Sequence, residues 1–190
     1  NSTDERFTPE FKKTTVRGIL EGHVTDNFGA IFAFSQRRSV MPLNLYDNSY
    51  VSPNNDSQKD QERKLDSYMH KTYWDVNDRL SVETTLMKAP QENVMFRDNY
   101  LNSGFVNING GQQGAIKAVW EGDHARWTHT LAVTDLYSSR EADSNETIQW
   151  YYSSVKNWGN PGNKNSRSGE GAFGSIDQTQ KGLDYKLKMD

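Results

Sequence analysis

Hydrophobic and polar residues alternate along about seven segments of this chain, with the repeat of two residues that is typical of β-strands. The sharpest example is the last segment, in which Leu183, Tyr185 and Leu187 share one face while Asp184 and Lys186 share the other. A strand of this kind has different surroundings on its two faces. The pattern therefore predicts an all-β protein.

The alternation also predicts where the other strands lie and which side chains face the same way. Strands are expected near residues 14–24, 28–35, 67–74, 80–87, 113–121 and 127–137. Because side chains alternate across a strand, one face of the paired strands collects the apolar residues. We expect that surface to contain Leu80, Val82, Leu86, Ile116, Leu131, Leu183, Tyr185 and Leu187, with Glu83, Lys117, Asp184 and Lys186 on the opposite, wet side.

Short turns and long polar segments alternate between the strands. The tight turns are Thr25-Asp26-Asn27, Asp75-Val76-Asn77-Asp78 and Gly122-Asp123-His124, and the long segments cover roughly residues 37–64, 90–111 and 140–181. If consecutive strands pair, all tight turns lie at one end of the sheet and all long segments at the other. Such asymmetry is typical of membrane barrels. The sequence thus predicts an antiparallel up-and-down meander, part of a transmembrane β-barrel with long loops on one rim.

Large aromatic residues lie close to the short turns. Trp74 precedes the second turn, and Trp120 and Trp127 flank the third. Rings at strand ends match the aromatic girdle of a membrane barrel, where they lie at the level of the lipid headgroups. A soluble antiparallel sheet with one wet face would alternate in the same way. The alternative is therefore a soluble β-sandwich binding module of a cell-surface protein that binds carbohydrate, with these tryptophans in its core or on a sugar platform.

The composition fits a barrel wall better than a soluble core. Only 34% of the 190 residues are hydrophobic and the mean hydropathy is -0.91, whereas a wall strand needs apolar residues only at every second position. No run of about 18 apolar residues exists, which excludes a membrane helix. The net charge of -3 is spread over segments of mixed sign, so no nucleic-acid partner is expected.

Two stretches of the chain resemble a known family. The first stretch ends at Gly111 and reads SVETTLMKAPQENVMFRDNYLNSGFVNINGG. It resembles a barrel hairpin and surface loop of the TonB-dependent outer-membrane receptors of Gram-negative bacteria. The second stretch ends at Asp190 and reads KNWGNPGNKNSRSGEGAFGSIDQTQKGLDYKLKMD. It resembles another long loop of these receptors together with the strand that follows it in the barrel wall. The resemblance covers most of the chain from about Thr14 onward, and it implies a plug domain followed by a barrel of about 22 strands.

The resemblance also implies a function. Members of this family import iron chelates, cobalamin or other scarce nutrients across the bacterial outer membrane with energy relayed from the inner membrane. The chain is then a barrel segment of a receptor for a small ligand such as a ferric siderophore or another metal chelate. Its partners would be outer-membrane lipid, the chelate and, through the rest of the parent protein, the TonB system. The chain departs from the family in having no plug, no TonB-contacting segment near its start and too few strands to close a barrel of that size, so residues 1–190 are expected to form one partial barrel domain.

The long segments carry aromatic residues and cations close together. Stacking and charge suit such groups to the capture of an aromatic or anionic ligand. The expected ligand-binding residues are Arg97, Tyr100, Trp150, Tyr152 and Trp158, and we expect contacts from these loops and not from the wall. The same rings would also suit packing of one loop against another, and the sequence leaves both interpretations open.

The sequence predicts no catalytic residues, no metal site and no cofactor. We expect structural or solvated roles for the 4 histidines. Ser138 and Ser139 lie near Asp135, but nothing marks an activated nucleophile, so an outer-membrane barrel enzyme ranks third. The glycines of Asn109-Gly110-Gly111 and Ser168-Gly169-Glu170-Gly171 lack the context of a phosphate loop, and we interpret them as flexible turns.

Overall fold

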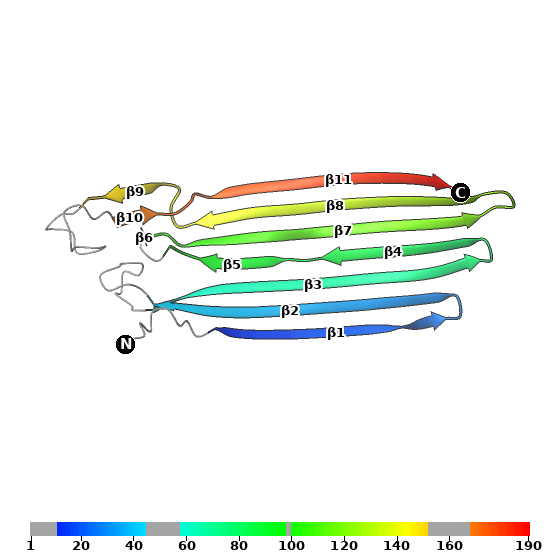
Figure 1. Ribbon diagram of the computed structural model, residues 1–190, viewed down its shortest axis with the longest axis horizontal. Helices are drawn as coiled ribbons and strands as arrows, with labels where there is room; N and C mark the ends of the chain where they lie inside the picture. Colours follow the sequence, from blue (N-terminus) through cyan, green and yellow to red (C-terminus); the bar gives the residue numbers. More distant parts are fainter. Residues whose placement is uncertain (1–10, 45–57, 98–99, 152–167) are drawn as a thin grey trace, which may run out of the picture.

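The computed structural model describes residues 11–44, 58–97, 100–151 and 168–190. Most of them form one broad antiparallel sheet (Figure 1). Its strands are β1 (Lys12–Thr25), β2 (Phe28–Asn44), β3 (Gln58–Asn77), β4 (Leu80–Lys88), β5 (Gln91–Met95), β7 (Phe105–Glu121), β8 (Arg126–Ala142) and β11 (Ile176–Met189). A separate 3-stranded sheet contains β6 (Tyr100–Leu101), β9 (Thr147–Trp150) and β10 (Ser168–Gly171).

Neighbouring strands of the large sheet follow one another along the chain. The order is β1-β2-β3-β4-β7-β8-β11, and β5 continues the line of β4 between β3 and β7. Every pairing in this sheet is antiparallel. This confirms the all-β antiparallel meander that the alternation predicts.

The tight turns all lie at one end of the sheet and the long connections at the other, as expected (Figure 1). Side chains fix these turns. Asn77 Oδ1 accepts hydrogen bonds from the backbone amides of Arg79 and Leu80, at 2.9 and 3.0 Å, and an asparagine bonded in this way holds the chain in a turn. Asn27 Nδ2 donates to the carbonyl oxygen of Asp75 at 3.0 Å, which links the first turn to the second.

The strands extend further into the long connections than the sequence predicts. β2 continues to Asn44 and β3 begins at Gln58, so much of the segment 37–64 is paired strand. The segment 90–111 contains β5 and the start of β7, and the segment 140–181 contains the end of β8 and the start of β11. The expected loop boundaries were therefore wrong. Hydrophobic alternation fades where both faces are polar, whereas backbone pairing does not depend on the side chains.

An interruption separates β4 from β5. Pro90 has no backbone N–H to donate, but its carbonyl oxygen accepts a hydrogen bond from the Asp66 amide at 2.9 Å. On the neighbouring strand β7, Gly111 has a φ of 133°, and a Cβ at this position would overlap the carbonyl oxygen of Asp135. The interpretation of Gly111 as part of a flexible turn was wrong, because it lies inside a paired strand and its conformation requires glycine.

The two faces of the large sheet differ as expected. In the register of β8 with β11, Leu183 lies opposite Val133 and Tyr185 lies opposite Leu131. The other residues predicted to be apolar neighbours lie on the same side. We call this side the apolar face and the opposite side the polar face.

The polar face carries charged side chains at the level of the apolar residues on the other side. Glu83 pairs with Lys117 at 3.2 Å and with Lys71 at 3.5 Å. Asp184 and Lys186 also lie on this face, as predicted. Burial of charged side chains in an apolar environment is energetically unfavourable, so the polar face is suited to contact with water.

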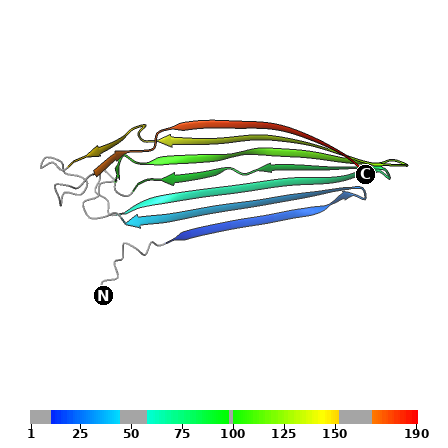
Figure 2. The same ribbon diagram turned by 45° about the horizontal axis from the view of Figure 1, so that its top comes forward.

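No other layer of strands covers the apolar face within the residues that the structure describes (Figure 2). Leu20 and Leu183 are 74% and 75% exposed. Buried hydrophobic residues of the described ranges are Phe96, Phe105, Val119 and Ala172. A β-sandwich packs the apolar faces of two sheets against each other, so this arrangement does not match the soluble sandwich alternative. In the same ranges, no helix is long and apolar enough to cross a membrane.

We call the part of the apolar face between the row of Trp120 and the row of Tyr68 the apolar region. Aromatic residues lie at both of its ends. Trp120 lies opposite Trp127 next to the turn between β7 and β8, and Trp74 lies in the adjacent row of the same face. This confirms that the tryptophans lie close to the tight turns. Tyr68 and Tyr137 lie on the apolar face towards the loop end.

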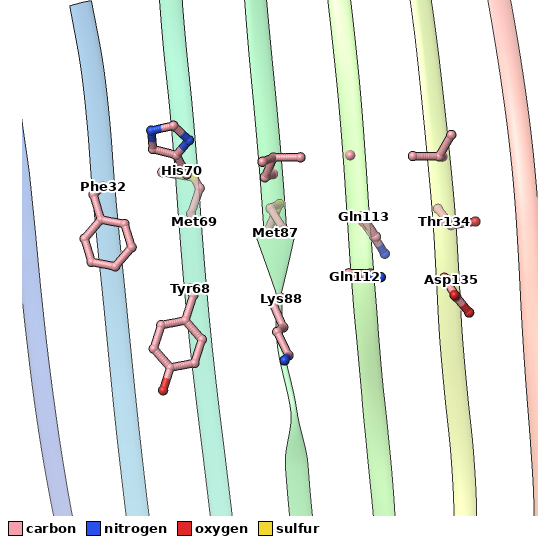
Figure 3. A pocket seen from close by; sticks show the side chains of 13 residues that line it. Phe32, Tyr68, Met69, His70, Met87, Lys88, Gln112, Gln113, Thr134 and Asp135 are labelled. Atoms are coloured by element: carbon pink, nitrogen blue, oxygen red, sulfur yellow. The ribbon is translucent and has the colours of Figure 1, made fainter.

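A polar row marks the loop side of the apolar region (Figure 3). Tyr68, Lys88, Gln112 and Asp135 lie next to one another on β3, β4, β7 and β8. They line a shallow hollow of about 340 Å³, to which Leu86 contributes apolar surface. The apolar region is therefore bounded by polar groups towards the loops and by tryptophans towards the tight turns.

Candidate functional site

The loop end of the molecule joins the two segments in which ligand-binding residues were expected. β10 pairs parallel with β6 and antiparallel with β9, which forms the small sheet. A Cβ at Gly169 would overlap the ring of Tyr100, and a Cβ at Gly171, where φ is 97°, would overlap the carbonyl oxygen of Glu146. The interpretation of these glycines as flexible turn residues was wrong, because they allow a close approach between paired strands.

Arg97 and Tyr100 lie in direct contact. The guanidinium carbon of Arg97 is 3.4 Å from the centre of the Tyr100 ring, an arrangement stabilised by attraction between the cation and the ring electrons. The hydroxyl of buried Ser103 donates to the carbonyl oxygen of Arg97 and accepts from the Arg97 amide, each at 3.0 Å. These bonds fix the backbone from which the guanidinium group extends.

Phe173 connects this pair to the large sheet. Its ring centre is 5.2 Å from the guanidinium carbon of Arg97 and 5.5 Å from that of Arg140. It meets the ring of Phe105 edge-on, with 5.4 Å between centroids, a favoured geometry for aromatic pairs. Arg140 Nε donates to Asn107 Oδ1 at 3.1 Å. We call Arg97, Tyr100, Phe105, Arg140 and Phe173 the ring cluster.

The sequence did not single out Phe173. It is the lone aromatic residue in Gly171-Ala172-Phe173-Gly174, and an isolated ring between glycines in a polar segment is the signal that could have found it. Ala172 beside it is only 1% exposed, whereas Phe173 is 57% exposed. The segment is therefore anchored by the alanine, while much of the phenylalanine ring stays open to solvent.

Trp150 lies on β9, in the same small sheet as Tyr100. Its Nε1 donates to Glu170 Oε2 at 2.8 Å, and Asn102 Nδ2 donates to Glu170 Oε1 at 3.2 Å. The structure thus brings Arg97, Tyr100 and Trp150 into one region by packing one loop against another. The loop-packing interpretation therefore holds for these residues, whereas their contact with a ligand stays a prediction.

Two expected ligand-binding residues, Tyr152 and Trp158, lie outside the residues that the structure describes. Trp150 is 43% exposed, so the loop contacts leave part of its ring accessible. In the described part of the chain, no group of three or more histidine, aspartate and glutamate residues is placed to hold a metal ion. The described residues of this region offer guanidinium groups and aromatic rings, which suit stacking and charge interactions.

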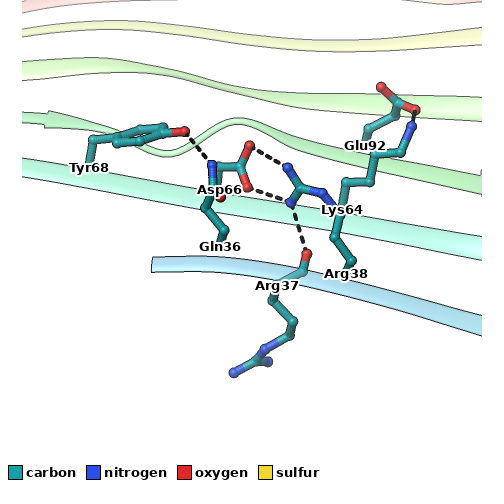
Figure 4. Close-up of polar contacts among 7 residues, drawn as sticks. All are labelled: Gln36, Arg37, Arg38, Lys64, Asp66, Tyr68 and Glu92. Atoms are coloured by element: carbon teal, nitrogen blue, oxygen red, sulfur yellow. Dashed lines mark hydrogen bonds and ion pairs between the residues drawn. The ribbon is translucent and has the colours of Figure 1, made fainter. Parts of the chain in front are cut away.

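A second cluster of polar side chains lies on the same face, on the loop side of the apolar region, where β2, β3 and β5 run side by side (Figure 4). Arg38 donates to both carboxylate oxygens of Asp66, at 3.0 Å for the Nη2 contact, and Lys64 Nζ donates to Glu92 Oε1 at 2.8 Å. The hydrogen bond from Arg38 lowers the pKa of Asp66, and the hydrogen bond to Glu92 raises the pKa of Lys64. The Asp66 side chain is 19% exposed, so the first pair is partly buried, and in both pairs the opposite charges neutralise each other.

No protein-family model matches the chain, and no curated protein sequence matches it. Among solved structures, the chain is similar to the crystal structure of the outer membrane transporter YddB from Escherichia coli, with a TM-score of 0.73 over 95% of this chain. The fold of the chain is similar to part of this outer-membrane transporter. It covers 23% of the length of that transporter at 18% sequence identity, so the likeness concerns the fold. The expected barrel architecture is confirmed at this level.

Proposed function

We propose that this chain is part of the wall of a TonB-dependent receptor in the bacterial outer membrane, and that the parent protein binds and imports a small ligand such as a ferric siderophore or another metal chelate. The observation that carries the proposal is the uncovered apolar face with aromatic residues at both ends. A large exposed apolar surface is unfavourable in water. Contact with lipid removes that cost.

The dimensions of the apolar region support contact with a bilayer. β4 contains 9 residues from Leu80 to Lys88. A tilted strand needs about 9–11 residues to cross a bilayer. In this placement Trp120 and Trp127 lie at one headgroup level and Tyr68 lies at the other.

The remaining surfaces of the sheet suit a wall that continues beyond this chain. The polar face, with Glu83 between Lys71 and Lys117, would line the aqueous interior. β1 and β11 each pair on one side only within the described ranges. An unpaired strand edge offers backbone hydrogen bonds to another strand, so both edges could pair with further wall strands of the parent protein.

Import requires a binding region at the outer rim, and the ring cluster offers suitable groups there. Its guanidinium groups and rings attract planar and anionic ligands. The chelate as cargo and TonB as energy source follow from the family resemblance. On this basis we extend them to the parent protein.

Spin labels on neighbouring residues test the membrane placement. Leu131 lies on the apolar face and Ala132 on the polar face. In the full-length protein in lipid vesicles, a nitroxide at Leu131→Cys should collide mainly with lipid-soluble oxygen. A nitroxide at Ala132→Cys should collide mainly with a water-soluble nickel complex. Equal accessibility at the two positions would contradict the proposed wall.

Uptake of radioactive iron tests the transport role. Cells that express the full-length protein should accumulate iron from at least one ferric chelate, and deletion of TonB should abolish this uptake. The same cells without the protein provide the background. Uptake that persists without TonB would remove the proposed energy source, and uptake at background for all chelates would contradict the transport role.

A further inference from the structure

The loop half of the large sheet separates its charges between the two faces. In the rows level with residues 12–17 of β1, the carboxylates on the apolar-face side are Glu62, Asp66, Glu92, Glu141 and Asp177. The charged side chains on the polar face of these rows are Lys13, Arg17, Arg37, Arg63 and Arg140. Among the described residues of the rows, the polar face therefore carries cations and no carboxylate.

The cations lie among neutral polar groups. One row of the polar face contains Lys13, Ser39, Arg63, Asn93, Asn107 and Arg140. The next row towards the turns contains Thr15, Arg37, Leu65, Gln91, Asn109 and Ser138. Adjacent strands are about 4.8 Å apart, so the backbones at Lys13 and Arg63, two strands apart, are roughly 10 Å apart.

Part of this surface is hollowed. Lys13, Arg37 and Arg63 line a hollow of about 400 Å³, together with the hydroxyl-bearing residue Ser39. The apolar lining includes Met41, Leu65 and Met95. Glu62 also borders the hollow, but its register places its side chain on the apolar-face side. A hollow of this size with a few polar groups has the dimensions of a small-molecule site.

No carboxylate of the described residues pairs with the cations around the hollow. Within the described ranges, Lys13, Arg37 and Arg63 form no ion pair, whereas their sequence neighbours on the other face, Arg38 and Lys64, are paired. Unpaired cations gathered on one surface raise the local potential and concentrate anions. The hydroxyl and amide groups between them provide further hydrogen bonds.

We infer that this hollow binds the negatively charged part of the imported cargo, and that the cargo is an anionic ferric chelate with carboxylate or catecholate oxygens. The inference rests on the proposed function, because it assigns a chemical class to the ligand of that receptor. It also places a ligand contact on the wall, at Arg37 and Arg63, where the sequence predicted contacts from the loops alone.

The chain offers a matched control, because Arg37 and Arg63 each precede a cation on the opposite face. The test variant of the full-length receptor is Arg37→Gln/Arg63→Gln, and the control is Arg38→Gln/Lys64→Gln. Both variants remove the same charge from the same strands. The probes are ferric enterobactin and ferric citrate, which are anionic, and ferrichrome, which is neutral. Binding to the purified receptor in detergent is followed by quenching of tryptophan fluorescence at low and high salt.

We expect the wild-type receptor to bind an anionic probe, and to bind it more weakly at high salt. Loss of charge-assisted hydrogen bonds should weaken this binding roughly tenfold or more in Arg37→Gln/Arg63→Gln. The control should stay within about twofold of the wild type, because charges far from the contact mainly affect association rates. Equal losses in the two variants, no loss in the test variant, or no binding of either anionic probe to the wild type would overturn the inference.

A second pair of variants covers the case in which the control folds poorly, because it breaks the ion pairs of Arg38 and Lys64. Lys12 and Lys13 are neighbours on opposite faces of β1, and neither forms an ion pair within the described residues. Lys13→Gln should weaken binding of the anionic probe and Lys12→Gln should not. The opposite order would overturn the inference.

The inference and the proposed function can fail separately. Import of ferrichrome without binding of either anionic probe would leave the transport role standing and overturn the anionic cargo. Failure to import any chelate would count against the transport role, and the comparison of Arg37→Gln/Arg63→Gln with its control would still decide whether the hollow binds anions.

Discussion

Trp120 and Trp127 lie directly opposite each other on β7 and β8, in the row of the apolar face next to the tight turn. Leu80 continues this row on β4, and Met189 continues it on β11. In the proposed bilayer placement, the row lies at the headgroup level, where amphipathic rings are favoured. In that placement, the pair marks the boundary of the membrane region on the side of the tight turns.

Substitution of these tryptophans should destabilise the wall. Trp120→Ala and Trp127→Ala are each expected to lower the free energy of unfolding by about 1 kcal/mol, through loss of a cross-strand neighbour. The double variant should cost less than the sum, because the two residues are neighbours. Urea titration of the full-length protein in lipid vesicles measures these changes. Thr128→Ala on the polar face is the control, and equal effects at all three positions would contradict the prediction.

A charge on the apolar face should cost far more than one on the polar face. Ile116 and Ala115 are adjacent on β7 and lie on opposite faces. Ile116→Lys is expected to lower the free energy of unfolding in vesicles by about 2–4 kcal/mol, because the ammonium group would lie in the hydrocarbon region. Ala115→Lys should cost much less. Similar costs at both positions would show that this face does not meet lipid.

The glycine opposite the interruption between β4 and β5 should tolerate no side chain. Gly111→Ala combines a φ of 133° with overlap between the new Cβ and the Asp135 carbonyl oxygen, and it should destabilise the protein by about 1–3 kcal/mol. Gly22→Ala is the control, because a Cβ there would meet nothing within 4 Å. Thermal or urea unfolding of both variants measures the difference, and a tolerated Gly111→Ala would rule out the conformation described here.

Asp66 should make the stability of the loop end depend on pH. Its pKa is lowered by the hydrogen bond from Arg38, from an ordinary value of 3.8. A carboxyl group with a lowered pKa stabilises the folded state above its unfolded pKa, and that contribution is lost as the pH falls through the folded pKa. The difference in free energy of unfolding between wild type and Asp66→Asn should therefore be constant above about pH 5 and shrink below pH 3.8.

The pH profile has a control on the same face. Asp177→Asn removes a carboxylate that forms no ion pair in the described residues. Its unfolding free energy should differ from that of the wild type by a small amount at neutral pH. A difference between wild type and Asp66→Asn that grows on acidification would contradict the assigned ion pair with Arg38.

Sequence alternation predicted the parts of the fold whose two faces have different surroundings. β4 and the central parts of β7, β8 and β11 carry mainly apolar residues at alternate positions, so their faces and register followed from the pattern. The outer parts of β2 and β3 were interpreted as loop. There Arg37 and Arg38 point to opposite faces, and a strand that is polar on both faces has no hydrophobic period to detect.

The ring cluster was only partly predictable from the sequence. Arg97 and Tyr100 were expected from the coincidence of a cation and a ring in a long polar segment. Phe105 and Phe173 meet because β6 and β10 pair, and this pairing depends on the lack of a side chain at Gly169. Hydrophobic periodicity contains no information about such a contact between distant segments.

The parallel pairing of β6 with β10 ties the second long connection to the third. Glu170 adds a side-chain link, because its carboxylate accepts hydrogen bonds from Asn102 on one side and from Trp150 on the other. β6 and β10 therefore cannot separate unless these bonds break. The described parts of the two connections form one mechanical unit, in which a displacement of β6 is transmitted to β10.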